Sequence, residues 1–317
     1  MRSVERTHAV GSRRSERPGW LRSRSVGVTL GLISMVGLAG CSMPAAIEAN
    51  EELVADRIDG NASIESHVLE QPNFDLHYRA VGRADEAVVL WIHGTPGGWS
   101  DIAGLMVDDA FTTRARLVSI DRPGWGGSQF RPKPRMAGTF AEHSELLEPL
   151  LRRLKAQYPD VPLIAAGHSW GAPMAAVLGA DHPTLVDGVL ALAGPFDPSL
   201  RILRWYNYAG RLPVVSWLIG AGLRNSNKEM FRLEGEVDEA QEQWRSLAVP
   251  LIVVHGEEDS IVPVAHAAYA ASLFDPAQTH ILRLPQQGHL LQFERTALIG
   301  RCALALARKD PAGCRER

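Results

Sequence analysis

Short apolar runs alternate with longer segments of helical pattern between residues 74 and 308. The runs with the pattern of strands are residues 74–82, 87–94, 117–124, 162–169, 188–195, 250–259 and 280–289. The helical candidates are residues 139–157, 170–178, 264–273 and 293–308. Continuous apolar strands separated by helices predict an α/β fold with a mostly parallel sheet covered by helices on both faces. Ligands of such sheets bind at the carboxyl ends of the strands.

The composition is that of an ordinary globular protein. Hydrophobic residues make up 45% and charged residues 22% of the 317 residues, which excludes a disordered or fibrous chain. The net charge of -3 conceals an asymmetry, because residues 1–40 contain seven Arg and two Glu and the rest of the chain is therefore acidic. An acidic body does not favour nucleic acid as a partner.

Residues 1–40 have the layout of a secretory signal. Arginines precede an uncharged stretch, residues 26–40, which is shorter than the ~20 residues of a membrane-spanning helix. The stretch ends in the motif LAGC at Cys41, which resembles the lipobox of bacterial lipoproteins. We therefore expect Cys41 to be lipidated and to anchor an exported protein to the cell envelope, at the outer membrane or the periplasmic face in a Gram-negative cell. The alternative is an incidental Cys41 and an ordinary cleavage nearby.

The domain organisation follows from these segments. Residues 41–72 are polar and acidic with little periodicity, which predicts a lipidated tether between the membrane and the folded domain. A first core segment then covers residues 73–197, an insertion covers residues 198–249, and a second core segment covers residues 250–317.

The pentapeptide GHSWG, centred on Ser169, follows an apolar strand and precedes a helical pattern. A nucleophile on a sharp turn between strand and helix needs flanking glycines, because larger side chains would collide with the neighbouring backbone. Such a turn places the Ser169 hydroxyl above the sheet edge, at the N-terminus of a helix. The alternative is an ordinary serine cap of that helix.

A serine nucleophile needs a base, and the base needs an orienting acceptor at another strand end. His289 lies just beyond the last predicted strand, and we assign it as the general base. Asp259 follows the preceding strand and is the favoured acid, with Asp197 and Glu258 as rivals. The remaining polar residues at strand ends are expected to hold loops in place: His93, Asp121, His168 and His255.

The oxyanion that develops in acyl transfer needs fixed N–H donors. The backbone amide of Trp170 directly follows the nucleophile, and that of Thr95 lies in the glycine-rich segment 93–98. We expect these two amides to form an oxyanion hole. The alternative for segment 93–98 is a turn that binds no ligand.

Five motifs occur in a fixed order along the chain: HGTPGG, DRPGWGGS, GHSWGA, HGEEDSIVP and QGHLLQFE. Together they resemble the α/β-hydrolase superfamily, in its serine-nucleophile branch of esterases and lipases. The resemblance implies a mostly parallel eight-stranded sheet, a Ser169-Asp259-His289 triad and the oxyanion hole described above. The chain departs from proline iminopeptidases, which carry HGGPG, because Thr95 replaces the second glycine.

The same resemblance makes residues 198–249 a small helical lid over the triad. The insertion contains the apolar run VVSWLIGAGL, which is too short to span a membrane. We expect this run to line an acyl pocket on the underside of the lid. Contact of the lid with lipid beside the anchor is the alternative.

Two further cysteines, Cys302 and Cys314, lie near the C-terminus. In an exported protein they are candidates for a disulfide that ties down the tail. The alternative is two free thiols, with Cys302 buried on a helix.

These features predict a lipid-anchored serine hydrolase that cleaves carboxylic esters, and less readily amides, of small and partly apolar molecules. The reaction runs through an acyl-enzyme and needs no metal or cofactor. Two alternatives remain open. One is a C–C bond hydrolase or a proline-iminopeptidase-like aminopeptidase with the same triad, and the other is a catalytically silent binding lipoprotein.

Overall fold

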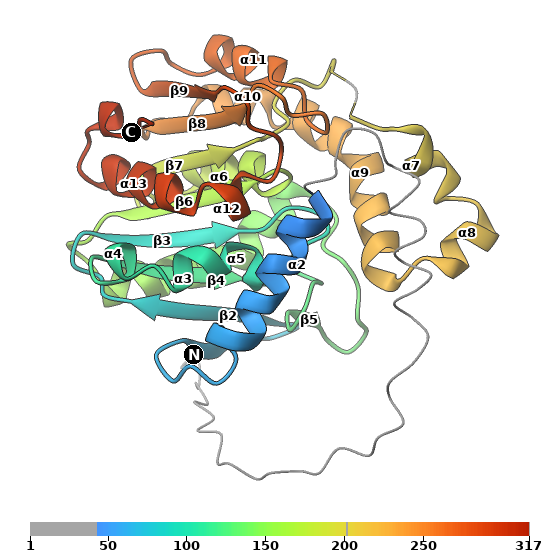
Figure 1. Ribbon diagram of the computed structural model, residues 1–317, viewed down its shortest axis with the longest axis horizontal. Coiled ribbons are helices and arrows are strands. Elements are labelled where there is room, and N and C mark those ends of the chain that lie inside the picture. The colour runs from blue at the N-terminus through green and yellow to red at the C-terminus, as the bar shows by residue number, and fades with distance from the viewer. Residues whose placement is uncertain (1–42, 201, 317) are drawn as a thin grey trace.

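The computed structural model describes residues 43–200 and 202–316. The predicted signal and Cys41 lie outside the described residues. Across the described ranges, we find no helix that combines the length and the apolar character needed to cross a bilayer. The described chain forms one central sheet with helices on both sides and a helical insertion beyond the carboxyl ends of its parallel strands (Figure 1).

The described part of the chain contributes nine strands to the sheet. They are β1 (Glu65–Gln71), β2 (Phe74–Gly82), β3 (Ala87–Ile92), β4 (Ala115–Ile120), β5 (Gln129–Phe130), β6 (Leu163–His168), β7 (Gly188–Leu192), β8 (Leu251–Gly256) and β9 (Thr279–Leu284). Eight of them lie in the order β1-β2-β4-β3-β6-β7-β8-β9, and the two-residue β5 pairs with β2. From β4 to β9 all pairs are parallel, whereas β1 and β2 are antiparallel to their neighbours. The predicted mostly parallel sheet is confirmed, and the described chain adds the short strand β5 to the eight strands expected.

Helices bury both faces of this sheet, which explains why its strands are apolar throughout. In β3, Val88, Leu90 and Ile92 enter one hydrophobic cluster, while Val89 and Trp91 enter the cluster on the opposite face. The helices of the core are η3 (Trp99–Ile102), α3 (Ala103–Met106), α4 (Asp109–Thr112), α5 (Phe140–Gln157), α6 (Gly171–Asp181), α11 (Ala265–Leu273), α12 (Leu291–Glu294), α13 (Thr296–Ala307) and η4 (Pro311–Gly313).

The N-terminal part of the described chain is folded onto the core. Residues 43–71 form α2 (Met43–Leu53), the π-helical turn η2 (Val54–Ile58) and the edge strand β1. The expectation of a tether is wrong over residues 43–71, because Ile58, Ile64 and Leu69 are buried and β1 pairs with β2 along its whole length. Burial in β1 alternates, but the inward positions beside Leu69 are the polar His67 and Gln71 and the apolar Val68 is exposed, so the sequence does not reveal the alternation.

The segment between β7 and β8, where an insertion was predicted, contains α7 (Trp205–Ala209), α8 (Pro213–Leu218), α9 (Ala221–Glu239) and α10 (Gln241–Arg245). Helices α7, α8 and α9 lie at the carboxyl ends of the parallel strands, whereas α10 packs beside α6 with Trp244 in the core (Figure 1). We call residues 202–249 the lid. Helix α8 buries no residue, and Trp217 is 81% exposed. The expectation that VVSWLIGAGL lines an acyl pocket is therefore wrong, because the run faces outward.

A disulfide joins Cys302 in α13 to Cys314 in the tail, with a sulfur–sulfur distance of 1.97 Å. Both cysteines are buried. The bridge holds the last described residues against the helix from which they emerge.

Candidate active site

Ser169 lies on the turn between β6 and α6. Its backbone φ of +54° falls in the left-handed region, which residues other than glycine rarely adopt. Glycines on both sides allow this turn. A Cβ on Gly167 would lie 2.0 Å from the carbonyl oxygen of Gly171, and a Cβ on Gly171 would lie 2.2 Å from that of Ile92. The strand, turn and helix thus place Ser169 as the sequence predicted, with its side chain only half-buried.

His289 follows β9, and its Nδ1 lies 2.7 Å from Oδ2 of Asp259 in the loop after β8. The N–H groups of Ile261 and Val262 donate to the other oxygen, Oδ1, at 2.9 and 2.8 Å. Burial raises the pKa of Asp259, but hydrogen bonds from His255, His289 and the N–H of Val262, together with the charge of His289, outweigh burial and hold this pKa below its usual range. A charged Asp259 keeps a proton on Nδ1 of His289, which leaves Nε2 as the acceptor for a second proton.

Neither rival acid has the contact that Asp259 makes. Oδ1 of Asp197 accepts hydrogen bonds from the N–H and the hydroxyl of Ser199, at 2.8 and 2.7 Å. Glu258 is exposed. The structure therefore brings Asp259 to His289.

His168 connects the serine turn to the histidine loop. Its Nε2 donates to the carbonyl oxygen of His289 at 2.7 Å, and the two ring centroids are 4.8 Å apart. Burial, followed by the charge of His289, lowers the pKa of His168 to about 3, so its ring is neutral. Within the described residues no hydrogen bond joins the Ser169 hydroxyl to His289. In ligand-free enzymes such contacts are often long and tighten when substrate binds.

The predicted oxyanion donors flank the nucleophile. A Cβ on Gly94 would lie 3.1 Å from Cβ of Ser169, so the segment that carries Thr95 passes directly beside the serine. The backbone N–H groups of Thr95 and Trp170 donate no hydrogen bond to any part of the chain that the structure describes. Two free N–H groups beside a nucleophile are what an oxyanion hole requires.

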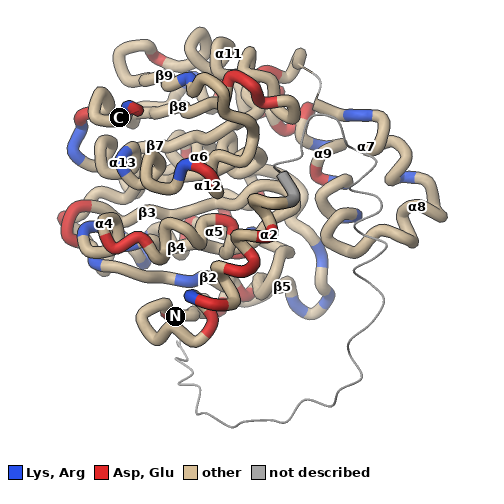
Figure 2. The backbone as a smooth tube through the Cα atoms, viewed as in Figure 1, with Lys and Arg blue, Asp and Glu red and all other residues tan. Residues whose placement is uncertain are grey.

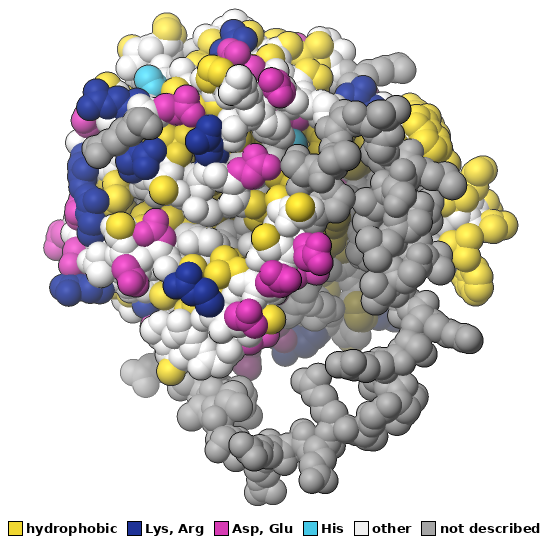
Figure 3. Space-filling model, viewed as in Figure 1, with side chains coloured by type: hydrophobic (Ala, Val, Ile, Leu, Met, Phe, Trp, Pro, Cys, Tyr) yellow, Lys and Arg dark blue, Asp and Glu magenta, His cyan; other side chains and the backbone are white. Residues whose placement is uncertain are grey.

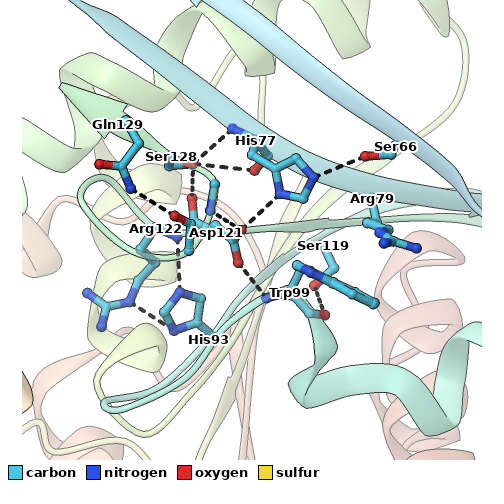
Figure 4. A network of polar contacts seen from close by, with 12 residues as sticks. Ser66, His77, Arg79, His93, Trp99, Ser119, Asp121, Arg122, Ser128 and Gln129 are labelled. Carbon is cyan, nitrogen blue, oxygen red and sulfur yellow. Dashed lines mark hydrogen bonds and ion pairs between the residues drawn. The ribbon is translucent and has the colours of Figure 1, made fainter. Parts of the chain in front are cut away.

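His93 and Asp121 hold loops together, as the sequence predicted (Figure 4). The backbone N–H of Arg122 donates to Nε2 of His93 at 3.0 Å. Asp121 accepts hydrogen bonds from the N–H groups of Trp99 and Gly127, at 2.9 and 2.8 Å. His255 has the same kind of role, because its Nε2 donates to the carbonyl oxygen of residue 262 at 2.8 Å.

A buried ion pair that the sequence did not predict lies beside this site. Both terminal nitrogens of Arg122 donate to the carboxylate of Glu229 in α9, each at 2.9 Å. Arg122 also donates to the carbonyl oxygen of Gly94 at 2.9 Å, and its guanidinium lies 3.9 Å from the ring centroid of Trp170. Burial raises the pKa of Glu229, but the charge of Arg122 and the hydrogen bonds from Arg122, Thr95 and Trp125 together outweigh burial and lower the pKa to about 2. A lone Glu in a polar helix gave no signal, since its partner is 107 residues away.

The ion pair lies at the boundary between the lid and the core. A groove of about 620 Å³ runs between α9 and the loop that follows β4, and Glu229 forms part of its wall. Among residues 43–200 and 202–316, no group of three or more His, Cys, Asp or Glu side chains is arranged to hold a metal ion.

Comparison with known proteins shows to which superfamily this protein belongs. Residues 87–214 match the alpha/beta hydrolase fold family, and residues 157–302 match the prolyl oligopeptidase family. Together with the sheet order and the serine turn, these matches show that the chain belongs to the α/β-hydrolase superfamily.

Individual relatives are distant. The AB hydrolase superfamily protein YfhM of Bacillus subtilis is 28% identical over 123 residues, which are 38% of this chain, and the chain spans only 40% of that relative's length. A protein described as a proposed lipase, from Acinetobacter baumannii, superposes with a TM-score of 0.61 at 16% identity, over 84% of this chain and 97% of that one. A bacterial membrane phospholipase A superposes with a TM-score of 0.59 at 18% identity, over 90% and 97%.

Proposed function

We propose that the protein is a serine hydrolase that cleaves carboxylic ester bonds through an acyl-enzyme formed on Ser169. The observation that carries the proposal is the joint placement of a strained serine turn and the Asp259–His289 pair, tied together by His168. A serine cap or a structural histidine would need neither the two glycines nor the buried acid.

The reaction follows from the positions of these groups. Nε2 of His289 accepts the proton of the Ser169 hydroxyl as its oxygen attacks the ester carbonyl. The N–H groups of Thr95 and Trp170 donate to the oxyanion, and each such donor typically lowers the barrier by ~3 kcal/mol. His289 then returns the proton to the leaving alcohol. Water activated by the same ring hydrolyses the acyl-enzyme and regenerates Ser169.

The substrate class is inferred from the relatives and from the site. The structural relatives include a proposed lipase and a phospholipase A, and lipases and phospholipases as classes cleave esters. Small, partly apolar esters are therefore the proposed substrates. The match to the prolyl oligopeptidase family over residues 157–302 favours peptide bonds as the second candidate.

The test is a panel of p-nitrophenyl esters, aminoacyl amides and lactones, assayed with the wild type and with Ser169→Ala. We expect ester hydrolysis that Ser169→Ala abolishes, and labelling by a fluorophosphonate that is lost in the same variant. Ser272→Ala, which replaces an exposed serine of α11, is the matched control and should react like the wild type. Equal rates for wild type and Ser169→Ala would contradict the proposal and leave a binding protein, and turnover of amides alone would favour the peptidase.

Export and lipidation are a separate proposal, supported by the basic and apolar layout of residues 1–40 and the motif that ends at Cys41. Acylation there would hold the enzyme at the cell envelope. In cells fed labelled palmitate, wild type should carry the label and sediment with membranes, whereas Cys41→Ser should do neither. A Cys41→Ser protein that still carries the label would contradict lipidation at this residue.

A further inference from the structure

Exposed apolar side chains gather on α7, α8 and the start of α9. Ten large hydrophobic side chains are exposed among the described residues, and eight of them lie between residues 205 and 223. The most exposed are Trp217 at 81%, Val214 at 71% and Trp205 at 69%. We call this segment, residues 203–228, the lid tip. It forms the end of the molecule farthest from the sheet, where the space-filling view shows a continuous apolar rim (Figures 1 and 3).

Polar contacts within the lid hold this surface outward. The side-chain amides of Asn207 and Asn227 connect α7 to α9, because Asn207 Nδ2 donates to Asn227 Oδ1 and Asn227 Nδ2 to the carbonyl oxygen of Asn207, each at 3.0 Å. Arg224 donates to the carbonyl oxygen of Ser216 at 3.1 Å and so fixes α8 on α9. The apolar side chains are therefore part of an ordered surface.

The charge of the lid tip differs from that of the rest of the protein. Between residues 203 and 228 the chain has four basic residues and no acidic one, although the whole protein carries a net charge of -3. The basic residues are Arg204, Arg211, Arg224 and Lys228, and Figure 2 shows basic positions flanking α7 and no acidic position on α7 or α8. Arg211 and Lys228 are exposed.

We propose that the lid tip docks on a lipid bilayer that contains anionic headgroups. Tryptophan and aliphatic side chains enter the interfacial region of a bilayer, while neighbouring Arg and Lys bind its anionic headgroups. Helix α8 has only six residues, so at 1.5 Å per residue it can lie in this region but cannot cross the bilayer.

The position at which helix α2 begins agrees with this orientation. Helix α2 begins at Met43, two residues after Cys41, on the side of the sheet where the lid lies (Figure 1). A membrane that holds the chain before α2 would therefore face the lid tip. The inference goes beyond the proposed esterase, because the surface is defined by exposure and charge and not by the triad.

Vesicle binding tests the proposal. The chain from residue 41 onward contains every described element and is used with Cys41→Ser, so that no acyl chain contributes. We expect it to sediment with vesicles of phosphatidylcholine and phosphatidylglycerol, and more weakly with phosphatidylcholine alone. The triple variant Trp205→Ser, Val214→Ser and Trp217→Ser should bind at least about tenfold more weakly. Arg211→Gln with Lys228→Gln should remove the preference for phosphatidylglycerol.

The controls separate the lid tip from other causes. Ile47→Ser with Val68→Ser removes two apolar side chains, 41% and 40% exposed, outside the lid tip and should bind like the parent. Ser169→Ala should also bind like the parent, which keeps this test independent of catalysis. Equal vesicle binding by the parent and the triple variant would overturn the proposal. A dimer of the parent without vesicles, which the triple variant converts to monomer, would also overturn it and assign the surface to a second copy.

Discussion

Arg122 and Glu229 form a buried, two-point ion pair that joins the core loop after β4 to lid helix α9. The same guanidinium holds the carbonyl oxygen of Gly94, the residue before the proposed oxyanion donor Thr95. Contact between the lid and the core is therefore coupled to the backbone position on which catalysis would depend.

Glu229→Gln should weaken both stability and turnover. The variant leaves Arg122 buried without its counter-charge, which typically costs about 3–5 kcal/mol of unfolding free energy. A shift of the Gly94 backbone should lower kcat by about ten- to a hundredfold. Urea unfolding and ester kinetics measure the two effects. Glu234→Gln, which changes an exposed carboxylate on the same helix, is the control. If Glu229→Gln lowered the unfolding free energy but left kcat unchanged, the ion pair would have only a structural role.

Asp259→Asn should lower kcat by about a thousandfold or more, because an amide no longer keeps the proton on Nδ1 of His289. Glu258→Gln removes the adjacent exposed carboxylate and should change kcat little. If Glu258→Gln or Asp197→Asn were the variant that lost activity, the assignment of the acid would be wrong.

Gly171→Ala should destabilise the serine turn, since its new Cβ would lie 2.2 Å from the carbonyl oxygen of Ile92. We expect a loss of about 1–3 kcal/mol or more in unfolding free energy, together with loss of turnover. Gly222→Ala, in α9 with no atom within 4 Å of the new Cβ, is the matched control. It should stabilise by up to about 1 kcal/mol, as expected for an exposed helical glycine.

Stability should fall as the solution is acidified below about pH 6.5. Burial is the main cause that lowers the pKa of His93 and His168 to about 3, and those of His143 and His266 to about 4. The folded state keeps these rings neutral while the unfolded chain takes up protons below its pKa of ~6.5. The neutral rings therefore make their full contribution to the free energy of unfolding above that pH. This contribution is lost as the pH falls towards 3–4, by up to about 1.4 kcal/mol per pH unit for each ring.

Urea unfolding at a series of pH values measures this slope. His143→Gln should reduce the slope of the unfolding free energy against pH by the equivalent of about one proton. His280→Gln, in the half-buried strand β9, is the control and should leave the slope unchanged. A slope that is the same in wild type and His143→Gln would contradict the assignment.

Removal of the disulfide should lower the unfolding free energy by about 3 kcal/mol, because the bridge closes a loop with a sequence separation of 12. Thermal unfolding with and without a reductant measures the change, with Cys302→Ala and Cys314→Ala together as the genetic equivalent. Turnover below the unfolding temperature should persist, since the bridge joins α13 to the tail and neither segment contributes a residue to the site described above. An unchanged Tm under reduction would show that the bridge adds no stability.

Much of the core followed from local pattern. Continuous apolar runs such as Ala87–Ile92 predicted buried parallel strands, because both faces of those strands pack against helices. The edge strand β1 was missed, since only Leu69 of its seven residues is buried. The apolar run VVSWLIGAGL was expected to line a pocket, whereas it faces outward. Its sequence could not decide this, because an apolar run has the same pattern whether it faces a pocket or solvent.

By itself, the sequence determined the parallel sheet, the serine on its glycine-flanked turn and the order in which acid and base follow it. These depend on short-range sterics and on the period of apolar residues, which neighbouring residues encode. Only the tertiary structure decided that Asp259, and neither Asp197 nor Glu258, meets His289, that Arg122 meets Glu229, and that Trp217 points outward. Such contacts join residues far apart in the chain, and their free energy depends on packing and dielectric surroundings that exist only once the chain has folded.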